Sequence, residues 1–274
     1  MIALCKSTDP MQIAVTREVS PGLGACELSY VPRSAIDLRL ANEQHHAYRQ
    51  ALESLGCRVL SLPAEPELPD SVFVEDVALV LDEVAILTRP GALSRRAEVA
   101  SVAKVLAGYR PLRAIEAPGT LDGGDVLRIG RTLHVGQSAR SSAAGFGQLR
   151  DLLSDEALSG RGYAVRAVPI RGCLHLKSAV TQVTDETLLV NPAWVDPAAF
   201  AGFRIIEVDV DEPHAANALR IGAGLIYPAC FPRTLQKLAD AGIVVTTVDV
   251  SELQKAEGAV TCCSLVFADA VTHG

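Results

Sequence analysis

The sequence predicts an α/β fold, a five-fold pseudosymmetric α/β-propeller of strand–strand–helix–strand (ββαβ) repeats. The first observation is that polar residues recur directly before short apolar segments, at Asp76, Asp125, Lys177, Asn217 and Cys262. Their spacings of 49, 52, 40 and 45 residues are typical of one supersecondary unit per repeat. The second observation is that short strand-like segments alternate with helical ones along the chain. Closing such repeats into a ring removes exposed sheet edges.

The elements follow from local patterns in chain order. Helix-period segments, the first of them ended by Gly56, predict helices over 41–55, 95–107, 143–153 and 234–241. Paired apolar runs around short turns, such as Asp82-Glu83 and Gly130-Arg131, predict hairpins. The expected strands are 57–62, 77–81, 84–88, 125–129, 132–135, 163–168, 179–183, 187–190, 218–221, 225–227, 243–248 and 261–267.

The two ends of the chain are expected to meet. The last strand, 261–267, would pair with an N-terminal strand over 2–5 and close the ring. There is no linker rich in Ser or Gly, so residues 1–274 are expected to form a single domain. Residues 16–37 have little periodicity and contain Pro21-Gly22-Leu23-Gly24. A functional lid and a plain surface loop are both open for this segment.

Composition narrows the function classes. The net charge of −7 and the lack of a Lys/Arg run argue against nucleic acid as a partner. The N-terminus does not resemble a signal peptide, and no apolar run reaches the length of a membrane span. The 7 cysteines show no paired zinc-type spacing, so we expect reduced thiols and a cytoplasmic location.

A thiol and an imidazole stand at equivalent places in the repeat. Cys262 precedes the last strand, and strand alternation would point it and Cys263 to opposite faces. A nucleophilic cysteine needs a neighbouring base, and His175 precedes the strand of an earlier unit. A histidine between two leucines is more often structural. The shared repeat position nevertheless favours a catalytic pair.

Acids and arginines recur in the same way. The glycines of Asp122-Gly-Gly-Asp125 allow close backbone approach, although a tight turn with a solvated acid would also explain them. Glu75 and Asp76, entering a buried strand, would need a cationic partner such as a guanidinium. Arg89 and Arg140 each follow a hairpin, so together they could clamp a carboxylate at one mouth.

These motifs resemble those of the dimethylarginine dimethylaminohydrolases, in the guanidine-modifying superfamily that also holds the arginine deiminases. The resemblance runs from about residue 10 to the end, and the implied fold is the pentein propeller. The segments that carry it are Phe73-Val-Glu-Asp76, Thr88-Arg-Pro-Gly-Ala92, Thr120-Leu-Asp-Gly-Gly-Asp125, Leu174-His-Leu-Lys-Ser178 and Thr261-Cys-Cys-Ser264.

The resemblance implies a role for each matching residue. It implies that Cys262 is the nucleophile, His175 the general acid/base and Asp122 the acid beside that histidine, where some relatives have Glu. The residues implied to bind substrate are Asp76 and Glu75 with Asp70 and Phe73 at the guanidinium, Arg89 and Arg140 at the carboxylate, and the carbonyls of Leu23 and Ala256 at the amino group.

The implied reaction is hydrolysis of N-methylated L-arginine to citrulline and an alkylamine through a covalent thiouronium. The resemblance implies no metal or organic cofactor, although zinc could inhibit by binding the thiol–histidine pair. The partner would be a small-molecule substrate, with a homo-oligomer left open. Three alternatives stay open: another guanidine substrate (hydroxyarginine, arginine or agmatine), a non-catalytic arginine-binding protein, and a structural repeat scaffold.

Overall fold

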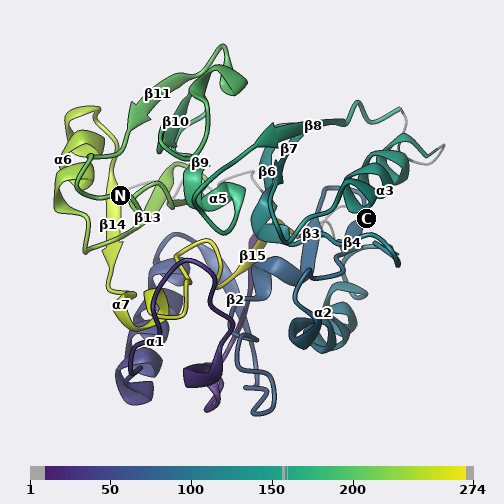
Figure 1. The fold of residues 1–274 in the computed structure, drawn as a ribbon, viewed down its shortest axis with the longest axis horizontal. Coiled ribbons are helices and arrows are strands. Elements are labelled where there is room, and N and C mark those ends of the chain that lie inside the picture. The colour runs from purple at the N-terminus through teal and green to yellow at the C-terminus, as the bar shows by residue number, and fades with distance from the viewer. Residues whose placement is uncertain (1–9, 156–157, 159, 270–274) are drawn as a thin grey trace, which may run out of the picture.

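The computed structural model describes residues 10–155, 158 and 160–269. Within these ranges fifteen strands form five three-stranded sheets, which surround a common centre in Figure 1. In each sheet the middle strand pairs antiparallel with one neighbour and parallel with the other. This arrangement confirms the predicted α/β-propeller of five repeats.

The sheets have the strand orders β15-β1-β2, β3-β4-β5, β6-β7-β8, β9-β10-β11 and β12-β13-β14. The strands are β1 (Gln12–Arg17), β2 (Cys57–Leu62), β3 (Ala78–Val80), β4 (Ala85–Leu87), β5 (Leu112–Ala114), β6 (Val126–Ile129), β7 (Thr132–Gln137), β8 (Ala164–Pro169), β9 (Val180–Gln182), β10 (Thr187–Val190), β11 (Arg204–Glu207), β12 (Leu219–Ile221), β13 (Gly224–Pro228), β14 (Val245–Val248) and β15 (Leu265–Ala268).

Helices cover the outside of the ring, as Figure 1 shows for α1, α2, α3 and α6. The α-helices are α1 (Leu38–Ser54), α2 (Val99–Leu106), α3 (Ala143–Ser154), α5 (Leu176–Ala179), α6 (Pro232–Asp240) and α7 (Ser251–Gln254). The 3-10 helices are η1 (Leu23–Ala25), η2 (Val74–Val77), η3 (Leu93–Glu98), η4 (Gly123–Asp125) and η5 (Pro197–Phe200).

Local chemistry explains where the helices begin and end. The Asp37 side chain accepts the backbone N–H of Leu40 and caps α1, which ends just before Gly56 with φ of 89°. Ser142 caps α3 in the same way through Gly145 N–H. The predicted helix over 95–107 instead begins as η3 and becomes α-helical only at Val99.

Two expectations about the ring need correction. The strand that closes it is β1, which pairs antiparallel with β15 and parallel with β2. The predicted strand over 2–5 lies outside the described residues. In the repeat formed by β9, β10 and β11, the connection between β10 and β11 contains the 3-10 helix η5 in place of an α-helix; Pro197 begins η5, and Gly202 follows it with φ of 99°.

The first strand of each repeat faces the centre of the ring. Residues of β3, β6, β9, β12 and β15 together line a central cavity, with Glu75 and Lys177 among its wall residues. The other faces of the sheets pack in five apolar clusters; Leu133 of β7 and Leu149 of α3, for example, are fully buried in one of them. Among the described residues no helix is long and apolar enough to span a bilayer.

Candidate active site

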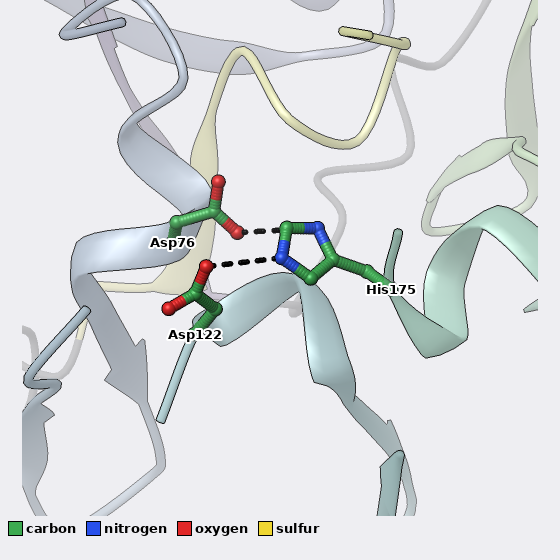
Figure 2. Close-up of side chains that lie close together, drawn as sticks. All are labelled: Asp76, Asp122 and His175. Atoms are coloured by element: carbon green, nitrogen blue, oxygen red, sulfur yellow. Dashed lines mark hydrogen bonds and ion pairs between the residues drawn. The ribbon is translucent and has the colours of Figure 1, made fainter. Parts of the chain in front are cut away.

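The site is built from short helical turns that precede the inner strands. Asp76 lies on η2 before β3, Asp122 is the residue before η4 and β6, and His175 is the residue before α5 and β9. Because these strands surround one centre, residues nearly a hundred positions apart meet there. Figure 2 shows the carboxylates of Asp76 and Asp122 side by side, both directed toward the His175 ring.

Two carboxylates hold His175. Its Nε2 lies 3.0 Å from Asp122 Oδ2 and its Nδ1 lies 3.8 Å from Asp76 Oδ1. Asp122 is itself fixed, because its Oδ1 accepts Gly91 N–H at 2.8 Å. Burial lowers the pKa of His175, but Asp76, Asp122 and Asp125 more than offset this and raise that pKa to about 9. The imidazole is therefore protonated at neutral pH.

Asp76 is the anion at the centre of the site. Its Oδ1 accepts Gly124 N–H at 2.9 Å and its Oδ2 lies 2.5 Å from Arg95 Nη1. Burial alone would raise the pKa of Asp76. The charges of His175 and Arg95 instead hold that pKa at about 2.

Glycines let the turns approach this closely. A Cβ on Gly124 would lie 2.6 Å from His175 Nδ1 and 2.7 Å from Asp76 Oδ1, and one on Gly123 would lie 2.0 Å from the Glu75 carbonyl oxygen. The Asp122-Gly-Gly-Asp125 motif is thus a site element in which a side chain at either glycine would collide. Asp125 completes it by accepting Leu176 N–H at 3.0 Å, which fixes the backbone after His175.

Cys262 shares a pocket with His175 and Asp76. The thiol side chain is partly exposed there, whereas Cys263 is fully buried in an apolar cluster. Residues 260–263 form turns instead of a strand, so the two side chains diverge through turn geometry. Burial and then the charges of Glu75 and Asp76 raise the pKa of the Cys262 thiol.

The pocket wall carries both signs of charge. It has four carboxylates, of Glu27, Asp70, Asp76 and Glu257, and three cationic side chains, of Arg95, Arg140 and His175. The rest of its wall is mainly apolar: Phe73, Leu174, Ala256, Gly258 and Cys262. A concave site with convergent charged groups and strongly shifted pKa values is typical of an enzyme active site.

Comparison with known proteins identifies the family. The chain is 41% identical over 259 residues to the N(G),N(G)-dimethylarginine dimethylaminohydrolase of Streptomyces coelicolor, which covers 93% of this chain and 97% of that protein. It is 39% identical over 233 residues to the enzyme of the same name from Pseudomonas aeruginosa, covering 84% and 90%. This chain belongs to the dimethylarginine dimethylaminohydrolase family. No protein-family model matches it.

Solved structures agree with the family. The dimethylarginine dimethylaminohydrolase of Pseudomonas aeruginosa, as a Cys-to-Ser mutant complexed with citrulline, superposes with a TM-score of 0.87 and 35% identity, covering 94% of this chain and 100% of that one. The N-terminal domain of ArgZ, a cyanobacterial arginine dihydrolase, matches with a TM-score of 0.78 at 20% identity over 93% and 97% of the two chains. The second similarity supports the fold alone.

Seven of the predicted site residues line this pocket of the dimethylarginine dimethylaminohydrolase fold. These are Asp70, Phe73, Asp76, Arg140, His175, Ala256 and Cys262. Asp122 lies directly behind His175.

Three predicted residues lie elsewhere. Arg89 donates to the Gly119 carbonyl oxygen at 3.1 Å, because its backbone bridges to Leu121 and turns the side chain along that segment. The Glu75 carboxylate pairs with Lys177 at 2.5 Å and lines the central cavity on the other side. Leu23 is buried in the apolar core, and its carbonyl accepts Cys26 N–H within η1.

The sequence reasoning missed Arg95 and Glu27. Arg95 is buried, and besides Asp76 it contacts Glu98 at 2.8 Å and the carbonyl oxygen of Phe73 at 3.0 Å. The one feature of the sequence that could have indicated a buried Arg95 is its spacing of three residues from Glu98. The same spacing is equally typical of an ion pair on the surface of a helix. Glu27 sits in the loop after β1 and accepts the Ser94 hydroxyl at 2.6 Å.

The loop after β1 is fastened over the pocket. The Asp70 carboxylate accepts Glu27 N–H at 3.1 Å, and the Glu257 carboxylate accepts the backbone N–H groups of Ser29, Tyr30 and Val31. These contacts join segments more than 220 positions apart at Glu257. They favour the lid interpretation of this segment over the plain surface loop.

Asp76, Asp122 and His175 also place ligand-type atoms within 4.8 Å of one another. His175 Nε2 lies 3.0 Å from Asp122 Oδ2, so a metal would have to displace the proton that joins them. The carboxylates already accept hydrogen bonds from Gly91, Gly124 and Arg95. The ligand-type atoms of this cluster are therefore already engaged within the protein.

Proposed function

We propose that this protein hydrolyses N-methylated L-arginines to L-citrulline and an alkylamine through a covalent thiouronium on Cys262. The observation that carries the proposal is that His175, held by Asp122 and Asp76, lies in the same pocket as the Cys262 thiol. Relatives at 39–41% identity named dimethylarginine dimethylaminohydrolase, and a structural neighbour that binds citrulline, support it.

Substrate charge and nucleophile activation are coupled in this pocket. In the free protein the raised pKa keeps Cys262 as a thiol, because burial disfavours the thiolate and the charges of Glu75 and Asp76 add to that effect. A guanidinium bound beside Asp76 offsets those charges and lowers the cost of the thiolate, whose proton passes to solvent because His175 is already protonated. The cationic substrate thereby promotes formation of its own nucleophile.

Proton transfer falls to His175. The thiolate sulfur bonds to the guanidinium carbon, the bond from that carbon to the substituted nitrogen breaks, and protonated His175 supplies the proton that this nitrogen needs to leave. Asp122 holds Nε2, so Nδ1 exchanges the proton. The neutral imidazole then takes a proton from water, whose oxygen displaces the sulfur and yields citrulline.

Recognition of the two ends of the substrate uses different walls. Asp76 and Asp70 supply negative charge for the guanidinium. The Glu75 carboxylate is bound by Lys177 and Thr261, so it contributes its charge from outside the pocket. Arg140 is half-buried and donates only a 3.3 Å bond to Ser29 Oγ, so it is available to a substrate carboxylate. Arg95 is the other arginine in the wall of this pocket, and Asp76 and Glu98 already pair with it.

Apolar side chains favour a methylated guanidinium. A methyl group cannot donate a hydrogen bond, so it needs an apolar neighbour, and Phe73 and Leu174 are the large apolar residues of the wall. The ring of Phe73 is held against Gly258, where a Cβ would lie 2.2 Å from Phe73 Cε1. An unsubstituted guanidinium would leave an N–H unpaired at this wall.

Amine release from a panel of arginine analogues tests the proposal. We expect dimethylamine from dimethylarginine and methylamine from monomethylarginine, each identified chemically, with citrulline in equal amount. Ammonia from free arginine at a higher kcat/KM than for any methylarginine would make the protein a deiminase. Stoichiometric binding of methylarginine without amine or citrulline would make it an arginine-binding protein.

A further inference from the structure

A second pocket adjoins the active-site pocket and has a different character. Both include Leu174, Glu257 and Gly258 in their walls, and Leu174 directly precedes His175. We call the second pocket the aromatic groove. It lies between the loop after β1, the segment before α5 and the turn after α7.

Four aromatic side chains line the aromatic groove: Tyr30, Trp194, His214 and Phe231. The rings of Trp194 and His214 pack edge to face, with centroids 5.0 Å apart and planes at 64°. Tyr30 is exposed and the Trp194 and Phe231 rings are partly exposed, so their faces are accessible to a ligand. These residues come from four separate segments of the chain, so the fold alone brings them together.

The charge of the aromatic groove is negative. Among the described residues of its wall, Glu257 is the one carboxylate, and no Lys or Arg is present. Partial desolvation lowers the pKa of His214, which leaves its ring neutral at pH 7 although Glu257 opposes part of the shift. Aromatic faces around a cavity with one anion are the arrangement that recognises alkylammonium ions through cation–π attraction.

We propose that the aromatic groove binds the alkylammonium product and is its exit route. This inference rests on the proposed function, which releases an alkylamine beside His175 while the amino-acid portion stays attached to Cys262. In the proposed binding mode that portion extends toward Arg140, so the amine leaves more readily past Leu174 and Gly258 into the groove. Once protonated, it meets the aromatic rings and the Glu257 carboxylate.

The chain offers a direct readout, because Trp194 is its single tryptophan. We would titrate the full-length protein with dimethylammonium and with tetramethylammonium chloride and follow Trp194 fluorescence, using sodium chloride at equal ionic strength and neutral tert-butanol as matched controls. We expect a saturable change with the two organic cations. The absence of saturation, or an equal response to tert-butanol, overturns the proposal.

Variants separate the contributions. Phe231→Leu keeps an apolar side chain but removes a ring, and Glu257→Gln removes the charge; each should weaken binding of tetramethylammonium about fivefold or more. Glu257 also fastens the lid, so Phe231→Leu is the decisive variant, and unchanged affinity in it overturns the proposal. Val244→Ala, at a surface position 81% exposed, is the control that should bind normally.

Cys262→Ser separates this inference from the proposed function. Binding to the groove should persist in Cys262→Ser, because the thiol lies in the other pocket. Binding of organic cations by a wild-type protein that releases no alkylamine would reject the proposed function and, with it, the role in product exit. Release of alkylamine by a protein that binds no alkylammonium would reject the aromatic groove and leave the proposed function intact.

Discussion

At the scale of single residues, two adjacent cysteines lie in different environments. Cys262 lines the pocket with His175, while Cys263 is fully buried and contacts the Ala259 carbonyl oxygen. We expect Cys262→Ala to abolish turnover of methylarginine. Cys263→Ala should keep most activity and lose on the order of 1 kcal/mol of stability, as for a small buried side chain. Activity assays with matched urea unfolding check this; equal losses of turnover in both variants would reject Cys262 as the nucleophile.

The charge of His175 links stability to pH. Its pKa rises from 6.5 when unfolded to about 9 in the folded protein, so the folded state binds the proton more tightly. The resulting stabilisation is fully present below pH 6.5 and is lost as the pH rises through 9. We expect the stability advantage of wild type over His175→Gln to shrink on the order of 1–3 kcal/mol between pH 6 and pH 10.

Urea unfolding at several pH values measures that difference. A constant gap between the two proteins would show that folding does not raise the pKa of His175. His175→Gln should also lower kcat by at least about 10²-fold, because proton transfer to the departing amine is lost. Normal kcat in this variant would exclude the acid/base role.

At the scale of elements, the turn η4 acts as a spacer between two charged groups. A Cβ on Gly124 would lie 2.6 Å from His175 Nδ1, so Gly124→Ala should displace the imidazole and lower kcat by about 10²-fold or more. Gly147→Ala in α3 is the control, since a Cβ there has no neighbour within 4 Å. The control should keep full activity and gain up to about 1 kcal/mol of helix stability. Activity assays of both variants test this, with circular dichroism spectra to check that each variant is folded. Full activity in Gly124→Ala would contradict this geometry.

Two arginines after neighbouring hairpins also behave differently. Arg140 follows β7 and lines the pocket, whereas Arg89 follows β4 and donates to the Gly119 carbonyl oxygen. We expect Arg140→Ala to lower kcat/KM for methylarginine by about 10-fold or more through a lost charge-assisted contact, with little effect on a decarboxylated analogue. Arg89→Ala should affect both substrates alike. A loss of selectivity in Arg89→Ala and none in Arg140→Ala would restore the sequence-based assignment.

At the scale of the whole molecule, the ring depends on β15, which joins the end of the described chain to β1. Phe267 of β15 pairs with Ile13, is buried, and packs edge to face on Tyr109 with centroids 5.3 Å apart. Phe267→Ala should therefore lower the free energy of unfolding by about 3–5 kcal/mol. Val244→Ala, at an exposed position, should change it by less than about 0.5 kcal/mol. The urea midpoints of the two variants measure these changes. Equal midpoints would mean that the stability of the ring does not depend on the packing of Phe267.

The sequence by itself determined the repeat and most of the chemistry. The regular spacing of polar strand starts predicts five units around one centre, and apolar alternation with turn residues locates nearly every hairpin because these signals are local. Asp76, His175 and Cys262 all fall in the short segments that precede the first strand of a repeat. Any closed ring of these units brings them together, which is why their meeting was predictable.

Tertiary structure alone decided which charges face the pocket. Whether Glu75 or Asp76 points inward, and whether Arg89 or Arg95 accompanies Arg140, depends on local turn geometry and on partners such as Lys177 and Gly119 elsewhere in the chain. The partner of the last strand was also predicted wrongly: we expected 2–5, whereas β1 (Gln12–Arg17) pairs with β15. Burial of paired charges is decided by long-range contacts, and a local pattern does not encode them.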